Sequence, residues 1–201
     1  FILMSANGVK ENGTGYQHTK YLAEEYLKAS GLNYTIFRPS LIFGPPKNDQ
    51  EFCTQLRDTM INLPIPAPLF FPGFNIFQVA QFKMSPIHVE NVAEFFVKSI
   101  EQKNHYMKTY ALGGLKSYNW KQIITNISTA LRKNKWMIPA PAMAVKMIAF
   151  LFDKFKFFPI TRDQITMLLE GNTCDSKHLF QEFNITPIDF SSQSLSYLKK
   201  K

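Results

Sequence analysis

The sequence predicts an α/β fold, built from a parallel sheet and a smaller, mostly helical lobe. An apolar run at residues 1–5 precedes a helical pattern at 20–28, and a β-branched and aromatic run follows at 33–37. This alternation of strand, helix and strand is typical of βαβ units, whose strands are parallel. The chain has 201 residues, which is enough to bury a sizeable core.

The helical pattern places apolar or aromatic residues at Tyr21, Leu22, Tyr26 and Leu27, with charged residues between them. Gly31 is a plausible stop for this helix. The strand that follows ends at a proline, and a loop rich in glycine and proline comes after it at 44–46.

Tyr16 and Lys20 are four residues apart and therefore share one helix face. An ammonium beside a phenol favours the phenolate and lowers the tyrosine pKa, which suits proton exchange with a carbonyl or alcohol oxygen. The spacing alone is also typical of an ordinary exposed helix. Ligands of open α/β sheets bind outside the carboxyl ends of the strands, so we expect this helix and the loop at 38–45 to border one crevice.

The remainder of the chain supplies further elements and the lobe. The pattern predicts helices at 49–63, 89–102 and 120–131, and strands at 75–84 and 109–112. We assign residues 1–48 and 83–118 to the sheet domain. The lobe is interleaved with it and comprises 49–82 and 119–201.

Charge and composition exclude some classes of function. The formal net charge is +8, but no RNA-binding motif, recognition helix or zinc spacing accompanies it, so we expect no nucleic-acid partner. The two cysteines suggest no disulfide framework, and the four histidines form no metal-binding pattern. We therefore assign no metal.

An apolar stretch at 142–158 carries only Lys146, Asp153, Lys154 and Lys156 as charged residues. It is too short and too charged to cross a bilayer comfortably. Two interpretations stay open: a core helix of the lobe, or an interfacial helix on an anionic membrane surface.

Taken together, the motifs resemble a known family. They are the run ending Met4-Ser5-Ala6, the Tyr16–Lys20 pair, Phe37-Arg-Pro-Ser-Leu-Ile-Phe-Gly-Pro45, Ser85-Pro-Ile-His-Val-Glu-Asn-Val-Ala93 and Thr109-Tyr-Ala-Leu-Gly-Gly114. In this order they resemble the atypical and extended short-chain dehydrogenases/reductases, which include NAD-dependent epimerases and dehydratases. The segment Phe158-Pro-Ile-Thr-Arg-Asp-Gln-Ile165 is most similar to the subgroup of the nucleotide-binding accessory subunit of respiratory complex I.

The resemblance implies the carboxyl-terminal part of a Rossmann-like NAD(P)-binding domain. Members of the family open with a glycine-rich turn that holds the pyrophosphate, and this sequence has no such turn. We expect a fragment that lacks about three βαβ units. The alternative is a naturally short protein.

The resemblance also implies roles for single residues. Tyr16 would be the general acid/base, and Lys20 would lower its pKa and bind the nicotinamide ribose. The segment of Arg38, Pro39 and Ser40 would bind the cofactor, NAD or NADP, with the backbone near Ser40 facing the carboxamide. Active relatives often carry a serine pair after the first strand, whereas this chain has Ser5 followed by alanine. If the catalytic position is the second of the pair, the donor to the substrate oxygen is lost; otherwise Ser5 is the candidate hydrogen-bond donor to that oxygen.

Two main classes of function remain. The first is a nucleotide-binding accessory protein of complex I type, with complex I subunits or a membrane surface as candidate partners. The second is an active NAD(P)-dependent oxidoreductase or sugar-nucleotide epimerase/dehydratase that uses Tyr16. A protein-interaction module with an inactive site is a third alternative. The implied locations are the matrix side of the mitochondrial inner membrane or a bacterial cytoplasm.

Overall fold

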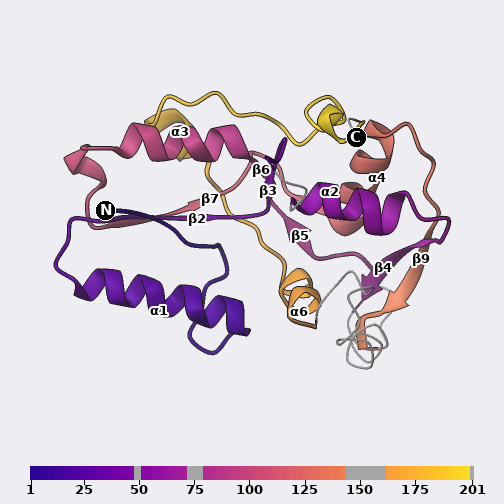
Figure 1. The fold of residues 1–201 in the computed structure, drawn as a ribbon, viewed down its shortest axis with the longest axis horizontal. Coiled ribbons are helices and arrows are strands. Elements are labelled where there is room, and N and C mark those ends of the chain that lie inside the picture. The colour runs from indigo at the N-terminus through magenta and orange to yellow at the C-terminus, as the bar shows by residue number, and fades with distance from the viewer. Residues whose placement is uncertain (48–50, 72–78, 144–161, 200–201) are drawn as a thin grey trace. The chain divides into compact units, whose positions relative to one another are not determined.

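A computed structural model describes residues 1–47, 51–71, 79–143 and 162–199 of the chain (Figure 1). The chain divides into two compact units. The first comprises Phe1–Ile42, Ser85–Ser117 and Asn172–Asp189, and the second comprises Phe43–Met84, Tyr118–Gly171 and Phe190–Lys201. The sequence analysis assigns residues 172–189 to the lobe, whereas in the structure they belong to the first unit.

The first unit is built on a parallel sheet of strand order β1-β2-β7. The strands are β1 (Ile2–Met4), β2 (Thr35–Pro39) and β7 (Lys108–Leu112). Met4 pairs with Phe37, and Phe37 pairs with Tyr110. The prediction that the opening run lies in a parallel sheet is therefore confirmed.

Helices cover both faces of this sheet. Figure 1 shows α1 (Gly15–Ala29) on one side of β2 and β7, and α3 (Val89–Ser99) on the other. Successive residues of a strand point to opposite faces, and β2 fills both layers accordingly. Ile36 packs with Leu27 of α1, whereas Phe37 packs with Phe95 of α3. Shorter elements complete the unit: β6 (Ile87–His88), the 3₁₀ turn η3 (Lys103–His105) and α7 (Lys177–Glu182).

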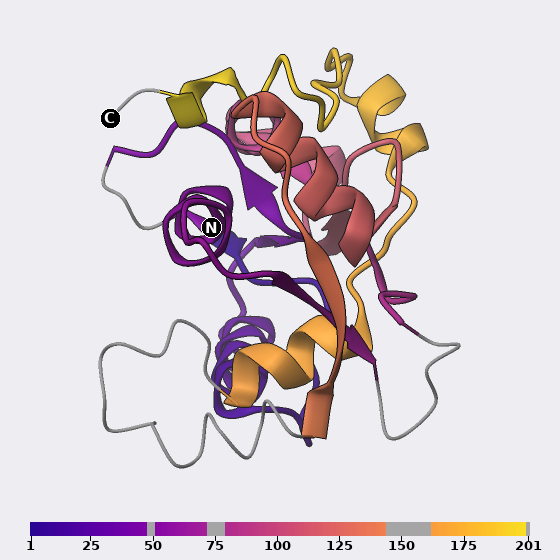
Figure 2. The ribbon, with the colours of Figure 1, turned by 90° about the vertical axis from the view of Figure 1, so that its right-hand side faces the viewer.

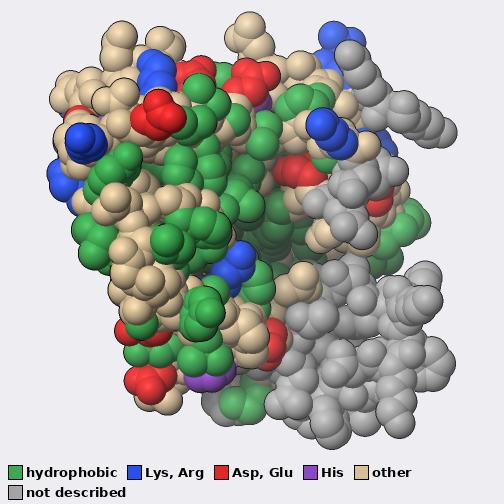
Figure 3. All heavy atoms as spheres, turned by 60° about the vertical axis from the view of Figure 1, so that its left-hand side comes forward, with side chains coloured by type: hydrophobic (Ala, Val, Ile, Leu, Met, Phe, Trp, Pro, Cys, Tyr) green, Lys and Arg blue, Asp and Glu red, His purple; other side chains and the backbone are tan. Residues whose placement is uncertain are grey.

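The inward face of α1 combines polar and apolar residues. Its inward residues are Gln17, Glu24 and Leu27, while Leu22 is exposed and Tyr26 is 82% exposed. Gln17 and Glu24 can occupy the inward face because each has hydrogen-bond partners there. Figure 3 shows hydrophobic side chains spread over the face of the molecule that it views.

The second unit combines short helices with two small ribbons. Strand β4 (Ala67–Phe71) pairs in parallel with β9 (Met137–Pro141), and β5 (Lys83–Met84) pairs antiparallel with β8 (Tyr118–Asn119). The helices are α2 (Phe52–Leu56), the π-helix η1 (Arg57–Ile61), α4 (Trp120–Ala130), α6 (Arg162–Glu170) and the 3₁₀ turn η4 (Ser196–Lys199). The two-residue strand β3 (Ile42–Phe43) lies where the chain passes from the first unit to the second.

The core of the second unit centres on Trp120, which is fully buried and stacks on Phe70 with ring centroids 5.9 Å apart. The predicted helices at 89–102 and 120–131 are present, each a little shorter than expected. Strands β4 and β9 were not predicted, because proline-rich sequence indicates loops. Within the predicted strand at 75–84, residues 75–78 lie outside the described residues, and the described strand is β5 alone. Most of the apolar stretch at 142–158 also lies outside them.

Candidate functional site

The helix that carries Tyr16 and Lys20 starts at a well-defined point. Thr14 is the N-cap, and its side chain and that of Gln17 form a reciprocal capping box. Gln17 also donates from Nε2 to the carbonyl oxygen of Gly8, at 3.0 Å. The capping box fixes the first turn of α1, and Tyr16 lies in that turn.

Lys20 joins this helix to the carboxyl end of β1. Its Nζ donates to the carbonyl oxygen of Met4 at 3.1 Å, and Met4 is the last residue of β1. The same Nζ lies 5.9 Å from the centroid of the Tyr16 ring. An ammonium has three hydrogens, so the Met4 contact leaves Lys20 able to donate to a ligand as well. The Tyr16 side chain is 50% exposed, which leaves its phenol accessible.

The pKa of Tyr16 moves in the direction opposite to the one expected from the sequence. Burial raises the pKa of this phenol, and Lys20 does not offset that effect. The geometry explains the difference, because the ammonium lies over the ring and bonds to a backbone carbonyl. Lowering a phenol's pKa requires the positive charge close to its oxygen.

Ser5 faces the interior of the unit. It is 3% exposed, and its backbone N–H donates to the carbonyl oxygen of Phe37 at 2.7 Å. Among the described residues its Oγ has no hydrogen-bond partner of ordinary geometry. It lies beside the carboxylate of Glu24 and helps to lower the pKa of that group. Glu24 lies about two helical turns beyond Tyr16 on α1, and it is the side chain that the structure places beside Ser5.

Glu24 and Arg38 form a two-pronged ion pair that the sequence analysis missed. Arg38 donates from Nε to Oε1 of Glu24 at 2.8 Å and from Nη2 to Oε2 at 2.5 Å. The carboxylate is fully buried. Burial by itself would raise the pKa of Glu24, but Arg38, Ser5 and the charge of Lys28 outweigh it, and the net shift is downward. A signal was present in the sequence: Glu24 follows Lys20 by four residues and so shares its helix face.

The predicted cofactor segment is held largely by internal contacts. The guanidinium of Arg38 is engaged by Glu24, and the carbonyl oxygen of Pro39 accepts from the N–H of Asn7 at 2.9 Å. Ser40 donates from its N–H to the carbonyl oxygen of Leu112 and from its Oγ to that of Asn172, both at 2.7 Å. The contact between Asn7 and Pro39 brings the loop after β1 beside the loop after β2. The structure therefore brings Tyr16, Lys20 and this segment to the same edge of the sheet, the edge where ligands of such sheets bind.

A separate cavity of about 360 Å³ lies within the second unit. Its lining includes Arg57, Lys133 and Lys199, and none of its lining residues is a predicted site residue.

Comparisons with known proteins find similar sequences. A family model described as "Male sterility protein", of the NAD-binding kind, matches residues 3–65, the part that holds β1, α1 and β2. The UDP-glucose 4-epimerase of Vibrio cholerae is 22% identical over 143 residues, covering 69% of this chain and 40% of that protein. The mitochondrial NADH-ubiquinone oxidoreductase 40 kDa subunit of Neurospora crassa is 25% identical over 121 residues, covering 59% of this chain and 32% of that protein.

Solved structures show the same fold. The UDP-glucuronic acid 4-epimerase of Bacillus cereus matches with a TM-score of 0.66 at 14% identity, over 100% of this chain and 61% of that one. The UDP-glucose 4-epimerase of Thermus thermophilus matches with a TM-score of 0.64 at 14% identity, over 98% of this chain and 62% of that one. The chain thus spans less than two thirds of the length of these proteins.

Fold and motif order together define a protein of the Rossmann-like, epimerase type. More particularly, the matched family model and the two curated relatives support an atypical, epimerase-like short-chain dehydrogenase/reductase as the kind of protein that this chain resembles.

Proposed function

We propose that this chain belongs to an NAD(P)-binding accessory protein of the complex I type, which holds its nucleotide chiefly as a structural element. The observation that carries the proposal is the position of Lys20. Its ammonium lies at the carboxyl end of β1, bonded to the Met4 carbonyl, with the accessible phenol of Tyr16 beside it. Ligands of open α/β sheets bind at this edge.

Each predicted site residue has a place in the proposal. Lys20 would donate to hydroxyl groups of the nicotinamide ribose, and Tyr16 would line the same position. Because the Arg38 guanidinium is already paired, the segment of Arg38, Pro39 and Ser40 would contribute its backbone and its shape. When bound, the dinucleotide would supply a hydride donor or acceptor; this chain's residues would orient it.

Two observations favour binding over catalysis. Ser5, the candidate donor to a substrate oxygen, is buried beside Glu24. Loss of such a donor lowers rates by about 10²–10³. The raised pKa of Tyr16 also makes the phenolate less available as a base near neutral pH.

The similarity to the 40 kDa subunit of Neurospora crassa complex I supports an association with respiratory complex I and a mitochondrial location. Co-migration with complex I activity on native gels of detergent-solubilised membranes would test the association. The proposed association would be contradicted if the protein migrates apart from every complex I band.

The alternative is an active enzyme, either an NAD(P)-dependent oxidoreductase or a sugar-nucleotide epimerase/dehydratase. The similarity to UDP-sugar epimerases favours it. Tyr16 would then exchange a proton with the substrate oxygen, with Lys20 adjusting its pKa and Ser5 as third member. An ammonium and a phenol on one helix face remain compatible with this chemistry.

Cofactor binding and turnover separate the two classes. In the protein as the cell makes it, titration with NADH or NADPH should quench or shift nicotinamide fluorescence. Lys20→Met should weaken this binding about tenfold or more, since it removes a charge-assisted hydrogen bond. Lys28→Met, two turns further along α1, is the matched control and should bind as the wild type does.

Turnover is then measured with quinones, simple carbonyls and UDP-sugars. The accessory role is supported if the wild type and Tyr16→Phe both bind the cofactor and the wild type shows no turnover that Tyr16→Phe lacks. Turnover that Tyr16→Phe abolishes supports the enzyme. If Lys20→Met binds both nucleotides as tightly as Lys28→Met does, Lys20 is not part of the nucleotide site and the proposal is wrong.

A further inference from the structure

In the second unit, the chain before β4 and the chain before β9 run side by side. Lys133 donates from Nζ to Oδ1 of Asn62 at 2.6 Å, and Lys135 donates from Nζ to the carbonyl oxygen of Leu63, also at 2.6 Å. The N–H of Ala67 then donates to the carbonyl oxygen of Trp136 at 2.8 Å. Figure 2 shows the parallel ribbon of β4 and β9 that these segments lead into.

Large apolar side chains of these two segments are exposed. Trp136 is 78% exposed, and Leu63, Ile65 and Ile138 are also exposed. Trp136 and Ile138 alternate with the less exposed Met137, as residues on one outward face of a strand do. A single exposed apolar residue needs no explanation, but a group of them on adjoining segments marks an interaction surface.

Cations are interleaved with these apolar side chains. Burial, together with the nearby charge of Lys133, lowers the pKa of Lys135. Both lysines bond to uncharged oxygens, so neither has its charge cancelled by these contacts.

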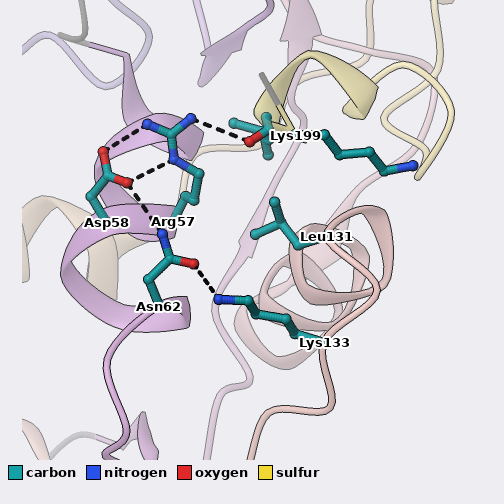
Figure 4. Close-up of a pocket in the computed structure, with 7 residues that line it drawn as sticks. Arg57, Asp58, Asn62, Leu131, Lys133 and Lys199 are labelled. Atoms are coloured by element: carbon teal, nitrogen blue, oxygen red, sulfur yellow. Dashed lines mark hydrogen bonds and ion pairs between the residues drawn. The ribbon is translucent and has the colours of Figure 1, made fainter. Parts of the chain in front are cut away.

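The cavity of about 360 Å³ adjoins this surface at Lys133, which lines the cavity together with its hydrogen-bond partner Asn62 (Figure 4). Asp58 is the acidic residue among its described lining, and Arg57 neutralises it with a two-pronged ion pair at 2.7 and 2.8 Å. Lys133 and Lys199 therefore leave the lining with net positive charge, while Leu131 and Leu198 give it apolar walls. Such a cavity suits a small anionic group that has an apolar attachment.

We propose that this basic-apolar face, made of Leu63, Ile65, Lys133, Lys135, Trp136, Ile138 and the adjoining cavity, docks onto an anionic phospholipid bilayer. Tryptophan and aliphatic side chains enter the boundary between headgroups and acyl chains, where an amphipathic indole is stable. The lysines lie against anionic headgroups, and the cavity receives a lipid phosphate. None of the described helices has the length and apolar character needed to span a bilayer. The face does not involve the proposed nucleotide residues, so this inference stands or falls separately from the proposed function.

The two tryptophans make the test direct, because Trp120 is fully buried and Trp136 is not. The protein as the cell makes it is mixed with vesicles of phosphatidylcholine alone or with about 30% phosphatidylserine. We expect co-flotation and a blue shift of tryptophan emission with the anionic vesicles, both weakened at high salt. Acyl-brominated lipid should quench the shifted emission, and Trp136→Phe should abolish the shift.

Charge reversal identifies the face. Lys133→Glu combined with Lys135→Glu should lower partition onto anionic vesicles by about tenfold or more. The matched control is Lys121→Glu combined with Lys98→Glu, which changes the net charge equally at sites outside the face and should reduce partition much less. Circular dichroism verifies that each variant is folded.

Three results would overturn the proposal. They are absence of wild-type partition onto anionic vesicles, equal losses in the two double variants, and partition without any change in Trp136 emission. Saturable binding of an acidic protein through this face, with no vesicle binding, would likewise assign the face to a protein partner.

Discussion

The two units each contain a two-pronged arginine–carboxylate pair, and the two pairs differ in almost every other respect. Arg38 and Glu24 lie 14 residues apart in sequence and join a strand to a helix across a fully buried carboxylate. Arg57 and Asp58 are neighbours in sequence, and the Asp58 side chain is 48% exposed. The geometry of the bonds is nearly the same, so the difference lies in what surrounds them.

The difference shows that hydrogen-bond geometry does not set the energetic importance of an ion pair. A buried charge that loses its partner has no water to replace it, whereas an exposed charge is resolvated at once. In the first unit the pair also connects the Tyr16 helix to the strand before Ser40, so it holds together the elements of the candidate site. In the second unit the pair removes a negative charge from the wall of a basic cavity.

Arg38→Met should therefore give the largest loss of stability among these variants. It leaves the buried carboxylate of Glu24 without compensation and should lower the free energy of unfolding by about 3–5 kcal/mol. Glu24→Met should cost somewhat less, because Arg38 is partly exposed and can turn to solvent. Urea unfolding followed by circular dichroism measures both.

The double variant Glu24→Met with Arg38→Met is the control, because replacing both charges with apolar groups often restores stability. We expect it to be more stable than Arg38→Met alone. If each single variant lowers the free energy of unfolding by no more than about 1 kcal/mol, this pair contributes no more than an exposed surface pair does. The contrast between the two units would then be wrong.

Acid should weaken the buried pair in a defined range of pH. The pKa of Glu24 in the folded chain lies below its ordinary value of 4.5, so the unfolded chain takes up this proton first as the pH falls. The contribution of Glu24 to stability is fully present above pH 4.5 and is lost as the pH falls through the lower, folded pKa.

Glu24→Gln makes this measurable because glutamine does not titrate. The difference in unfolding free energy between wild type and Glu24→Gln should be constant between about pH 7 and pH 5, then shrink towards about pH 3. A difference that stays constant over the whole range would show that the pKa of Glu24 is not shifted.

The first unit could be predicted from local patterns further than the second. Strands β1, β2 and β7 each have a short run of apolar and β-branched residues, and the pairing of parallel strands follows from the helix between them. The common face of Tyr16 and Lys20 follows from helical spacing alone. The position of the Lys20 ammonium does not, because a lysine side chain has many rotamers and Met4 offers it a carbonyl that only the fold brings near.

Features that depend on distant partners could not be predicted from local patterns. Glu24 is inward because Arg38 comes from another element to neutralise it, so the periodicity of apolar residues along α1 does not reveal that Glu24 is buried. Strands β4 and β9 contain prolines that indicate loops, yet they pair with one another. They are too far apart in the sequence for any local pattern to reveal the pairing. In both cases a tertiary contact outweighs local propensity.

Asp58→Asn should have the smallest effect on stability and a distinct effect on the second unit. Arg57 holds the pKa of Asp58 below its ordinary value, but the exposed side chain limits the stability that this pair contributes to less than about 1 kcal/mol. The same change removes the negative charge among the described lining of the cavity, so partition onto anionic vesicles should rise by about fivefold. Asp163→Asn, which makes the same charge change on α6, is the matched control. Equal gains in both variants would mean that net charge, and not the cavity, controls the attraction, whereas a gain confined to Asp58→Asn would link this exposed ion pair to the docking face.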